Sequence, residues 1–363
     1  MSGSLGRAVL VGMSVALGAS VAGRTQPLAQ PPAQAPAPPQ AKSATPSPES
    51  RERAEQVLAE ARKALGGDKL AAVKTLVAAG RTRRIRGNNL VPIEFELFLE
   101  LPDKYLRANE FPAEDTDPTS SGFNGDALIQ IPPPPSGPVP GRPMGAPGAG
   151  PPRAMPPGAA RPGGPPGGGR GPAPDPRRAR VSSIKQDYAR LALGLFAASP
   201  PAYPLTFSFA AIAEAPQGKA DVLDVKGQGN FALRYFIHSE TRLPVMVSWT
   251  TPPTNVIVTV PGKPAPASVA PGAVVVAGPP APAAGASKEE TDRYAKEVLA
   301  LRSKAQATPV EHRLYFADYR DVDGVRFPFR LRRAIGTETT EETTFDRFRI
   351  NTKIDSRKFE AVK

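Results

Sequence analysis

The sequence contains no cysteine and only two histidines among its 363 residues. Without thiols the chain can form no disulfide bond, no thiolate metal site and no cysteine nucleophile, and we expect no lipid-modified cysteine at its N-terminus. A zinc site needs three or four protein ligands, which the isolated His238 and His312 do not supply. The sequence therefore predicts a protein without a bound metal ion.

Catalytic and phosphate-binding motifs are also missing from the patterned parts of the chain. No G-x-S-x-G elbow, H-E-x-x-H pair or Walker loop occurs there, and the stretch "GGGRG" lies in a proline- and glycine-rich tract with no strand before it. Glu94, Glu96 and Glu100 fall on one face of a predicted strand, which is typical of a solvated face rather than of an acid–base pair. We therefore predict a protein that is not an enzyme and uses no cofactor.

One long apolar run occurs, and it lies close to the N-terminus. Arg7 precedes the apolar stretch "AVLVGMSVALGA", and Ser20-Val21-Ala22 follows it with the small-x-small pattern of a cleavage site. The stretch is too short to span a bilayer comfortably, although an uncleaved membrane anchor is the alternative. The pattern predicts a signal peptide over residues 1–22, a periplasmic protein, and no stable transmembrane insertion after cleavage.

Proline and glycine are abundant, at 46 and 33 residues, but they are concentrated in a few tracts. Residues 23–49 form a Pro/Ala-rich segment that cannot build a core, and we predict a disordered tether there. Two further tracts, at about 132–176 and 261–286, separate strand-like segments that are too short to fold alone. We interpret them as disordered insertions in a single domain over residues 50–363, because long loops add little closure entropy.

The formal net charge is +12, which favours anionic partners such as nucleic acid, lipid headgroups or acidic polysaccharide. The arginines gather in two predicted strands, at Arg81, Arg83, Arg84 and Arg86, and at Arg326, Arg330, Arg332 and Arg333. These strands lack the interleaved aromatic residues that stack on bases, so we expect no nucleic-acid partner. Cross-strand ion pairs with glutamates and contacts with lipid headgroups remain as the two interpretations.

Alternating apolar residues dominate the rest of the chain. Ile93, Phe95, Leu97 and Leu99 fall on one face of a predicted strand, as do Phe231, Leu233 and Tyr235 of another. Helices are predicted after Ser50, around Tyr188 and after Ser287, the last with Glu290 completing a capping box. About ten strands with short turns and three helices predict an α+β protein in which successive antiparallel strands form a sandwich or barrel.

The order of several loose motifs resembles the LolA-like, outer-membrane lipoprotein-sorting family of periplasmic carriers. These motifs are "ARKALGGDKLAAVKTL", "LPDKYLRA", "GFNGDALIQ", "YFIHSETRLPVMVSW", "DYRDVDGVRFPFRLR" and "NTKIDSRKFEA". The resemblance implies a half-open antiparallel β-barrel, mainly β with α, whose concave apolar face is covered by helices. In that family the hollow accepts the acyl chains of lipoproteins or related lipids. The proline-rich insertions depart from the usual family pattern.

The resemblance also implies which residues bind the ligand. The expected cavity lining is Ile93, Phe95, Leu97, Leu99, Tyr188, Leu191, Leu195, Phe231, Leu233 and Tyr235. The family closes its lid with a strand arginine, and Arg81, Arg83 and Arg84 are the candidates for lid or headgroup contacts. The expected partners are lipid or lipoprotein acyl chains and an envelope membrane protein.

Two other functions remain open at this point. The protein could be a structural or interaction module of the cell envelope, with a filled core and proline-rich arms that bind partners. An exported hydrolase is a third class, which no constellation of residues in the sequence supports. A vacant inner wall of the sheet favours the carrier, and a filled one favours the module.

Overall fold

The chain divides into two units, residues 1–45 and 46–363. The computed structural model describes residues 46–86, 89–112, 116–133, 175–215, 218–262, 269–270 and 272–360 of the second unit. The predicted signal peptide, most of the tether and most of the first insertion lie outside the described residues. The described helices are α1 (Pro48–Leu65), α2 (Asp68–Ala71), α3 (Pro176–Phe196), α4 (Lys288–Ala307) and the 3-10 helix η1 (Ser356–Phe359).

Twelve of the described strands form one sheet, and the remaining two form a separate parallel pair, β10–β11. The strands are β1 (Thr75–Arg86), β2 (Asn89–Glu100), β3 (Lys104–Glu110), β4 (Thr119–Asn124), β5 (Ala127–Ile131), β6 (Thr206–Ala215), β7 (Gly218–Lys226), β8 (Ala232–His238), β9 (Pro244–Thr251), β10 (Asn255–Thr259), β11 (Ala273–Ala277), β12 (Val310–Val322), β13 (Val325–Ile335) and β14 (Glu338–Ile350). The predicted α+β class is confirmed, with more strands than the expected ten.

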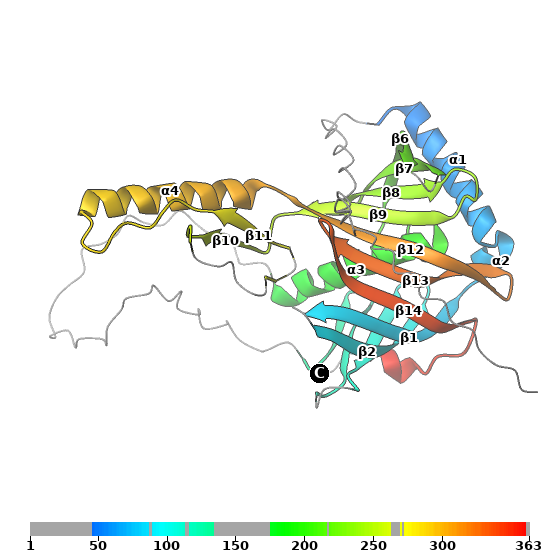
Figure 1. The fold of residues 1–363 in the computed structure, drawn as a ribbon. Helices are drawn as coiled ribbons and strands as arrows, with labels where there is room; N and C mark the ends of the chain where they lie inside the picture. Colours follow the sequence, from blue (N-terminus) through cyan, green and yellow to red (C-terminus); the bar gives the residue numbers. More distant parts are fainter. Residues whose placement is uncertain are drawn as a thin grey trace, which may run out of the picture. The chain divides into compact units, whose positions relative to one another are not determined.

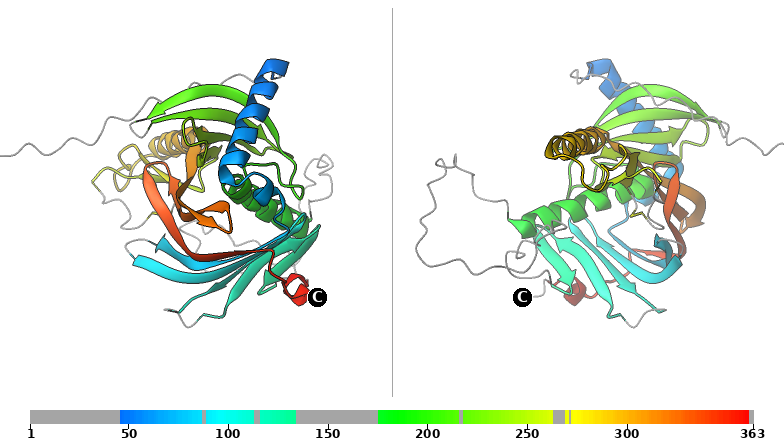
Figure 2. Two further views of the ribbon diagram at one scale, coloured as in Figure 1. Left: turned by 90° about the vertical axis from the view of Figure 1, so that its right-hand side faces the viewer. Right: turned by 60° about the vertical axis from the view of Figure 1, so that its left-hand side comes forward.

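The large sheet is antiparallel throughout and is not closed. Its strand order is β5-β4-β3-β2-β1-β14-β13-β12-β9-β8-β7-β6, so β5 and β6 are its two edges. The pairing of β1 with β14 joins the first and last strands of the sequence at the middle of the sheet. Figures 1 and 2 show that the sheet curves strongly around α3. The concave side of this sheet is therefore the place to look for a site.

Strand β2 shows how the sequence pattern separates the two faces of the sheet. Ile93, Phe95, Leu97 and Leu99 are all buried, while the intervening Glu94 is exposed, as strand alternation predicts. The pattern ends at the outward-facing Phe98, which is also buried. It packs in a separate outer cluster with Val77, Leu106, Ile129 and Phe359.

The C-terminal segment covers that outer cluster. Phe359 of η1 is buried, and the ammonium group of Lys358 lies 4.2 Å from the centre of the Phe98 ring. Asn124 of β4 donates a hydrogen bond to the carbonyl of Phe359 at 3.2 Å. The end of the chain therefore stabilises the convex face of β1–β5 and leaves the concave face free of it.

Helix α1 packs against the sheet near edge strand β6. Its apolar stripe of Ala54, Val57, Leu58, Ala61 and Leu65 is buried as predicted. The predicted cap was wrong by one turn, because Ser47 rather than Ser50 accepts the N-terminal hydrogen bond. The Ser50 hydroxyl instead donates to the carbonyl of Phe209 on β6 at 2.9 Å, which ties the helix to the sheet edge.

Helix α4 and the β10–β11 pair pack against each other. The predicted capping box of Ser287 and Glu290 is present at the N-terminus of α4. Residues 261–286 were expected to be a disordered insertion, yet Ala273–Ala277 within them form β11, which pairs with β10 in parallel. The expectation of disorder is therefore wrong for Ala273–Ala277, whose three successive valines are β-branched residues with high strand propensity.

Helix α3 is the most deeply buried helix of the described residues. Its second half, from Tyr188 to Leu195, is buried except for Arg190, and it crosses the concave face of the sheet (Figure 2). Gly194 lies so close to β12 that a Cβ atom there would stand 2.1 Å from the Phe316 ring. The absence of a side chain at this position is therefore what allows α3 to approach the sheet.

We predict that Gly194→Ala destabilises the protein although alanine has the higher helix propensity. The added methyl group displaces the buried Phe316 ring, and overpacking of this kind lowers the free energy of unfolding by about 1–3 kcal/mol. Urea unfolding measures the change. Combining the substitution with Phe316→Leu makes room for the methyl group, so the double variant should lose less than the sum of the two single changes. Additive losses would contradict the close contact.

Candidate functional site

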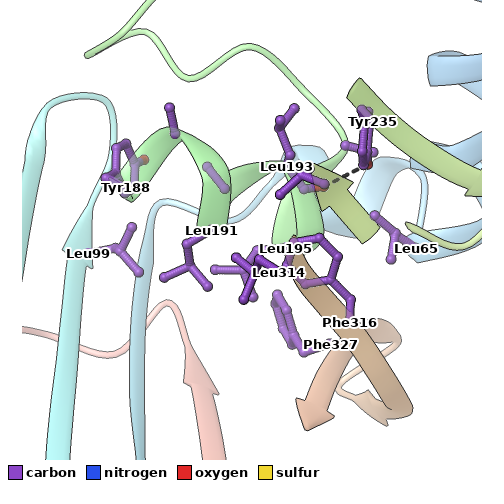
Figure 3. Close-up of a cluster of buried hydrophobic side chains, with 14 of the residues drawn as sticks. Leu65, Leu99, Tyr188, Leu191, Leu193, Leu195, Tyr235, Leu314, Phe316 and Phe327 are labelled. Carbon is purple, nitrogen blue, oxygen red and sulfur yellow. Dashed lines mark hydrogen bonds between the residues drawn. The ribbon is translucent and has the colours of Figure 1, made fainter. Parts of the chain in front are cut away.

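The residues expected to line a cavity lie on the concave face, where all ten are buried. Seven are on strands β2 and β8 or directly before β8, and three are on α3. Nine of them belong to one continuous core cluster; Ile93 lies beyond it, opposite Thr82 of β1. Figure 3 shows Leu191 and Leu195 of α3 among Leu99, Leu314 and Phe316 of the sheet. The structure therefore brings the predicted residues together, with α3 packed among them.

The buried half of α3 is held by two tyrosine hydroxyls from the sheet. Tyr235 of β8 donates to the carbonyl of Leu193 at 2.8 Å (Figure 3), and Tyr319 of β12 donates to the carbonyl of Gly194 at 3.2 Å. Burial raises the pKa of Tyr235 and of Tyr319 far above the ordinary tyrosine value. Both hydroxyls therefore stay protonated and act as donors to the last turn of the helix.

The middle of α3 is held by aromatic packing. Tyr188 packs between Tyr105 and Phe123, with ring centres 5.2 and 5.4 Å apart. Before Tyr188 the helix is largely exposed. Its polar contacts to the β4–β5 hairpin are from Lys185 to Asp126 at 2.7 Å and from Arg180 to Gln130 at 3.1 Å. Exposed pairs of this kind contribute little, about 0–1 kcal/mol each. The N-terminal half of α3 is thus much more weakly attached than the C-terminal half.

A small cavity remains between α3 and the sheet. Its volume is about 40 Å³, and its apolar walls are Phe95, Leu97, Leu191, Leu314, Leu331 and Phe345. This is room for about one water molecule. The open hollow implied by the family resemblance is therefore not present in this structure, because α3 fills it. Of the predicted lining residues, Phe95, Leu97 and Leu191 contribute to the walls of this cavity.

A larger depression lies elsewhere, with a volume of about 490 Å³. It is formed by α1, the β8–β9 turn and β13, and its lining is Glu60, Lys63, Ala64, Arg242 and Arg326. Four of these five residues are charged, which does not suit an acyl chain. The smaller cavity beside α3, with its apolar walls, is the better candidate site.

One end of the cavity is polar, because charged side chains from the neighbouring strands β1, β14 and β13 meet there. Glu341 of β14 is only 13% exposed and lies 3.3 Å from Arg84 and 3.9 Å from Arg333. Burial by itself raises the pKa of Glu341, but the charges of Arg333, Arg107 and Arg84 outweigh it and hold the pKa below its ordinary value. Glu341 is therefore a carboxylate at neutral pH, surrounded by three guanidinium groups.

Arg107 of β3 belongs to the same polar end. Its guanidinium lies 4.4 Å from the centre of the Phe95 ring and donates to Thr82 and Asn109, both at 2.9 Å. Thr82 in turn shares a 2.9 Å hydrogen bond with Thr343, so the two threonines link β1 to β14 beneath the arginine. Burial lowers the pKa of Arg107, and the charge of Glu341 opposes that change.

The arginines selected from the sequence are only partly the ones at this site. Arg81 and Arg83 share the outer face of β1, where Arg81 pairs with Asp346 at 3.0 Å. Arg84 shares the inner face with Thr82 and pairs with Glu341 at 3.3 Å. The ion pairs that Arg81 and Arg84 form with described residues do not involve α3. Cross-strand ion pairs were one of the two interpretations, and these two pairs are of that kind.

Sequence reasoning missed Arg107 and Glu341, and it named Arg333 only among the strand arginines and not as a residue of the site. A signal for the two arginines was present. Arg107 is two residues from Tyr105, and Arg333 follows Phe327, Phe329 and Leu331 in steps of two, so each shares a strand face with buried residues. Glu341 carries no such signal, since its importance comes from pairing with residues far away in the sequence. Strand alternation alone would have placed both arginines on the buried face.

The described residues contain no group of three or more side chains arranged to hold a metal ion. His312 stacks on Trp249 with ring centres 5.4 Å apart and shares a 2.8 Å hydrogen bond with Thr251. Burial and the nearby charges of Arg190 and Arg333 lower the pKa of His312. Among the described helices, none has both the length and the apolar character needed to cross a membrane.

The chain is weakly similar to several solved structures. They include a LolA superfamily protein from Nitrosomonas europaea, which is 9% identical with a TM-score of 0.42 over 85% of this chain and 97% of that one. An outer membrane lipoprotein-sorting protein domain from Vibrio parahaemolyticus is 10% identical with a TM-score of 0.38, over 84% of this chain and 97% of that one.

A DUF1329 family protein from Desulfovibrio piger is similar to the same degree, at 7% identity and a TM-score of 0.37 over 85% of this chain and 97% of that one. No protein-family model matches the chain. No curated protein sequence matches it either. Identities and TM-scores this low transfer no ligand and no role, so the function has to be argued from the site itself.

The buried tyrosines predict a steep loss of stability in alkali. Because burial raises the pKa of Tyr105, Tyr188, Tyr235 and Tyr319 in the folded state, their contribution is fully present below the ordinary value of about 10. The free energy of unfolding should therefore fall as the pH rises above about 10. Tyrosinate absorbance measures ionisation of the tyrosines, and circular dichroism measures loss of the fold. Both signals should change over the same pH range. Their ionisation while the fold persists would contradict the tight packing of α3.

Glu341→Gln should destabilise the protein, whereas Glu342→Gln is its matched control on the opposite face of β14. Removing the nearly buried carboxylate leaves the arginines short of a partner, and we expect a loss of about 1–3 kcal/mol at pH 7. Glu342 is 43% exposed and lies 3.8 Å from Arg330, so its loss should cost about 0–1 kcal/mol.

The acid side of the stability profile gives a second readout for Glu341. Its pKa is lowered in the folded state, so its contribution is present above the ordinary carboxyl value of about 4.3 and is lost as the pH falls through the folded value. Chemical unfolding between neutral and acidic pH should therefore show a shallower acid loss in Glu341→Gln than in the unmodified protein. Equal acid profiles would show that Glu341 is not coupled to the arginines.

Proposed function

We propose that the protein binds acyl chains of lipids or lipoproteins on the concave face of its sheet, without catalysis, as a carrier or sensor in the periplasm. The observation that supports this most directly is the cavity beside α3. Its six apolar lining residues come from α3 and from strands β2, β12, β13 and β14. A pocket walled by long apolar side chains suits an aliphatic chain. Such a task requires no catalytic group.

Binding of a chain requires α3 to move, because the cavity holds only about 40 Å³. Each methylene group buried from water contributes about 0.8 kcal/mol, so a chain of several methylenes can offset a limited displacement of the helix. The curved, open sheet then acts as a half-barrel, and α3 acts as its removable cover. The weakly attached N-terminal half of α3 is the part that would move first.

The periplasmic location rests on the predicted signal peptide at residues 1–22, which is outside the described residues. In that compartment a carrier exchanges its cargo with membranes or with an envelope membrane protein, and we include such a partner in the proposal. Residues 50–363 would form the single binding domain, and residues 23–49 its tether. The proline-rich insertions have no role in the proposed binding.

A second candidate is a structural or interaction module of the cell envelope with a filled core. The observation that favours it is the tight packing of α3 against the sheet, including the contact of Gly194 with Phe316. The two functions differ in whether α3 can be displaced by an amphiphile. The module predicts no such displacement, and it predicts that binding to envelope partners depends on the proline-rich segments.

Native mass spectrometry of the protein expressed with its export signal, together with lipid extraction, tests the proposed function. We expect lipid to co-purify, and a fluorescent fatty acid to bind the delipidated protein at one saturable site. If no lipid co-purifies and the fatty acid does not bind saturably, acyl-chain binding is refuted and the module remains. Pull-downs with and without residues 134–174 would then test the module directly.

The coupling between α3 and binding gives a sharper test. In a Tyr235→Phe, Tyr319→Phe double variant the two hydroxyls no longer hold the helix, so displacing it costs less. Each hydrogen bond contributes about 1 kcal/mol, so we expect the affinity for the fluorescent fatty acid to rise by up to about thirtyfold while stability falls.

Tyr315→Phe is the control for that experiment. Tyr315 lies on the same strand β12 as Tyr319, but it faces outward, where Arg332 lies 4.4 Å from the centre of its ring. Its loss should leave the affinity for the fatty acid unchanged. An unchanged affinity in the double variant as well would mean that binding does not involve movement of α3.

A further inference from the structure

The arginines at the polar end of the cavity outnumber the carboxylates that face them. Arg107 and Arg333 line the cavity with Asp187 and Glu341, and Arg84 and Arg190 stand directly behind these carboxylates. Four cations therefore meet two anions around a cavity that is otherwise apolar. These arginines range from nearly buried (Arg190) to half-exposed (Arg84), and a surplus of partly buried positive charge costs desolvation energy that a bound anion offsets.

We propose that the ligand of the concave site is an acidic amphiphile, whose carboxylate or phosphate headgroup binds Arg107 and Arg333 while its acyl chain lies along the apolar walls. This inference rests on the proposed acyl-chain binding and specifies its substrate class. Guanidinium groups present paired N–H donors that match the oxygens of either headgroup. Carboxylate and phosphate share this chemistry, and competition binding with one amphiphile of each kind distinguishes them.

Arg107 has donor capacity to spare for such a headgroup. Its hydrogen bonds to described residues leave from Nε to Asn109 and from Nη2 to Thr82. A guanidinium carries five N–H groups, so three of them are not engaged by these bonds. The guanidinium carbon of Arg107 lies 4.4 Å from the centre of the Phe95 ring, and both residues line the cavity.

Arg190 of α3 extends the positive region. Its guanidinium lies between the aromatic rings of Trp249 and Phe231, at 4.4 and 5.0 Å, and donates to Asp187 at 2.9 Å. Its Nε atom is buried without a hydrogen-bond partner in the described part of the chain. Because Arg190 and Asp187 are both on α3, a shift of the helix would move this pair relative to Arg107 and Arg333.

Glu341 occupies the position that a bound anion would compete for. Its carboxylate lies 3.3 Å from Arg84 and 3.9 Å from Arg333, and it contributes to the wall of the same cavity. A headgroup entering the cavity would join or replace this internal carboxylate. The proposal therefore requires opposite effects from removing an arginine and from removing Glu341.

Three amphiphiles of equal chain length, each competing with the fluorescent fatty acid, test the proposal. They are an ionised fatty acid, a lysophosphatidic acid and an uncharged monoacylglycerol. Charge-assisted hydrogen bonds should favour at least one of the acidic compounds over the monoacylglycerol by about tenfold. The acidic compound with the higher affinity relative to the monoacylglycerol identifies carboxylate or phosphate as the headgroup.

Arg107→Met and Arg333→Met should each reduce this acidic preference toward parity without weakening monoacylglycerol binding, because methionine keeps an apolar side chain at the wall. Glu341→Gln should increase the preference, because it removes the competing carboxylate. The matched control is Arg81→Met on the outer face of β1, whose side chain is 65% exposed and pairs with Asp346. It should change neither affinity.

The outcomes separate the two levels of the argument. If all three amphiphiles bind equally, or if the preference is insensitive to Arg107, Arg333 and Glu341, the headgroup site is wrong while acyl-chain binding stands. If no amphiphile binds at all, the proposed function fails and the headgroup site fails with it. Two arginine variants are used so that loss of folding in one of them leaves the other as a test.

Discussion

The burial of one helix against the concave face of an open sheet is the interaction on which the rest of the structure depends. Twelve antiparallel strands curve without closing, so their inner apolar side chains need a cover. Helix α3 provides it, and a glycine at position 194 and two tyrosine hydroxyls adapt the helix and the sheet to each other. The cavity, its polar end and its access all follow from where this helix lies.

The charged groups beside the cavity are difficult to explain by stability alone. A buried ion pair often contributes less than well-packed apolar residues would, and an excess of like charges contributes less still. Arg107 is nevertheless placed against Phe95 and anchored by two hydrogen bonds, and Glu341 is held among three arginines. Charged groups with shifted pKa values cluster at functional sites, and this arrangement beside an apolar cavity supports a role in recognition.

The sequence predicted local structure well and the site only in part. Alternation placed Phe95 and Leu97 on the buried face, and three-and-four spacing placed Tyr188 and Leu191 on the buried side of α3, because both patterns depend on nearby residues. That α3 fills the hollow could not be predicted, since it depends on the fit of Gly194 to Phe316 across the fold. The pairing of Arg84 with Glu341 joins residues 257 positions apart, and no local pattern shows it.

The same apolar surface must be covered either by α3 or by a bound chain, so binding is an exchange rather than an addition. Complete removal of α3 would expose its whole buried face, including Leu193 and Leu195, and domains of this kind are stable by only about 5–15 kcal/mol. A ligand that contributes about 0.8 kcal/mol per methylene could not support that loss and remain reversibly bound. The exchange is therefore partial. It begins at the cavity walls, which include Leu191 of α3, and the hydrogen bonds from Tyr235 and Tyr319 to the last turn of the helix oppose it. This places the entering chain next to the arginines, so that helix movement and headgroup recognition involve the same end of the cavity.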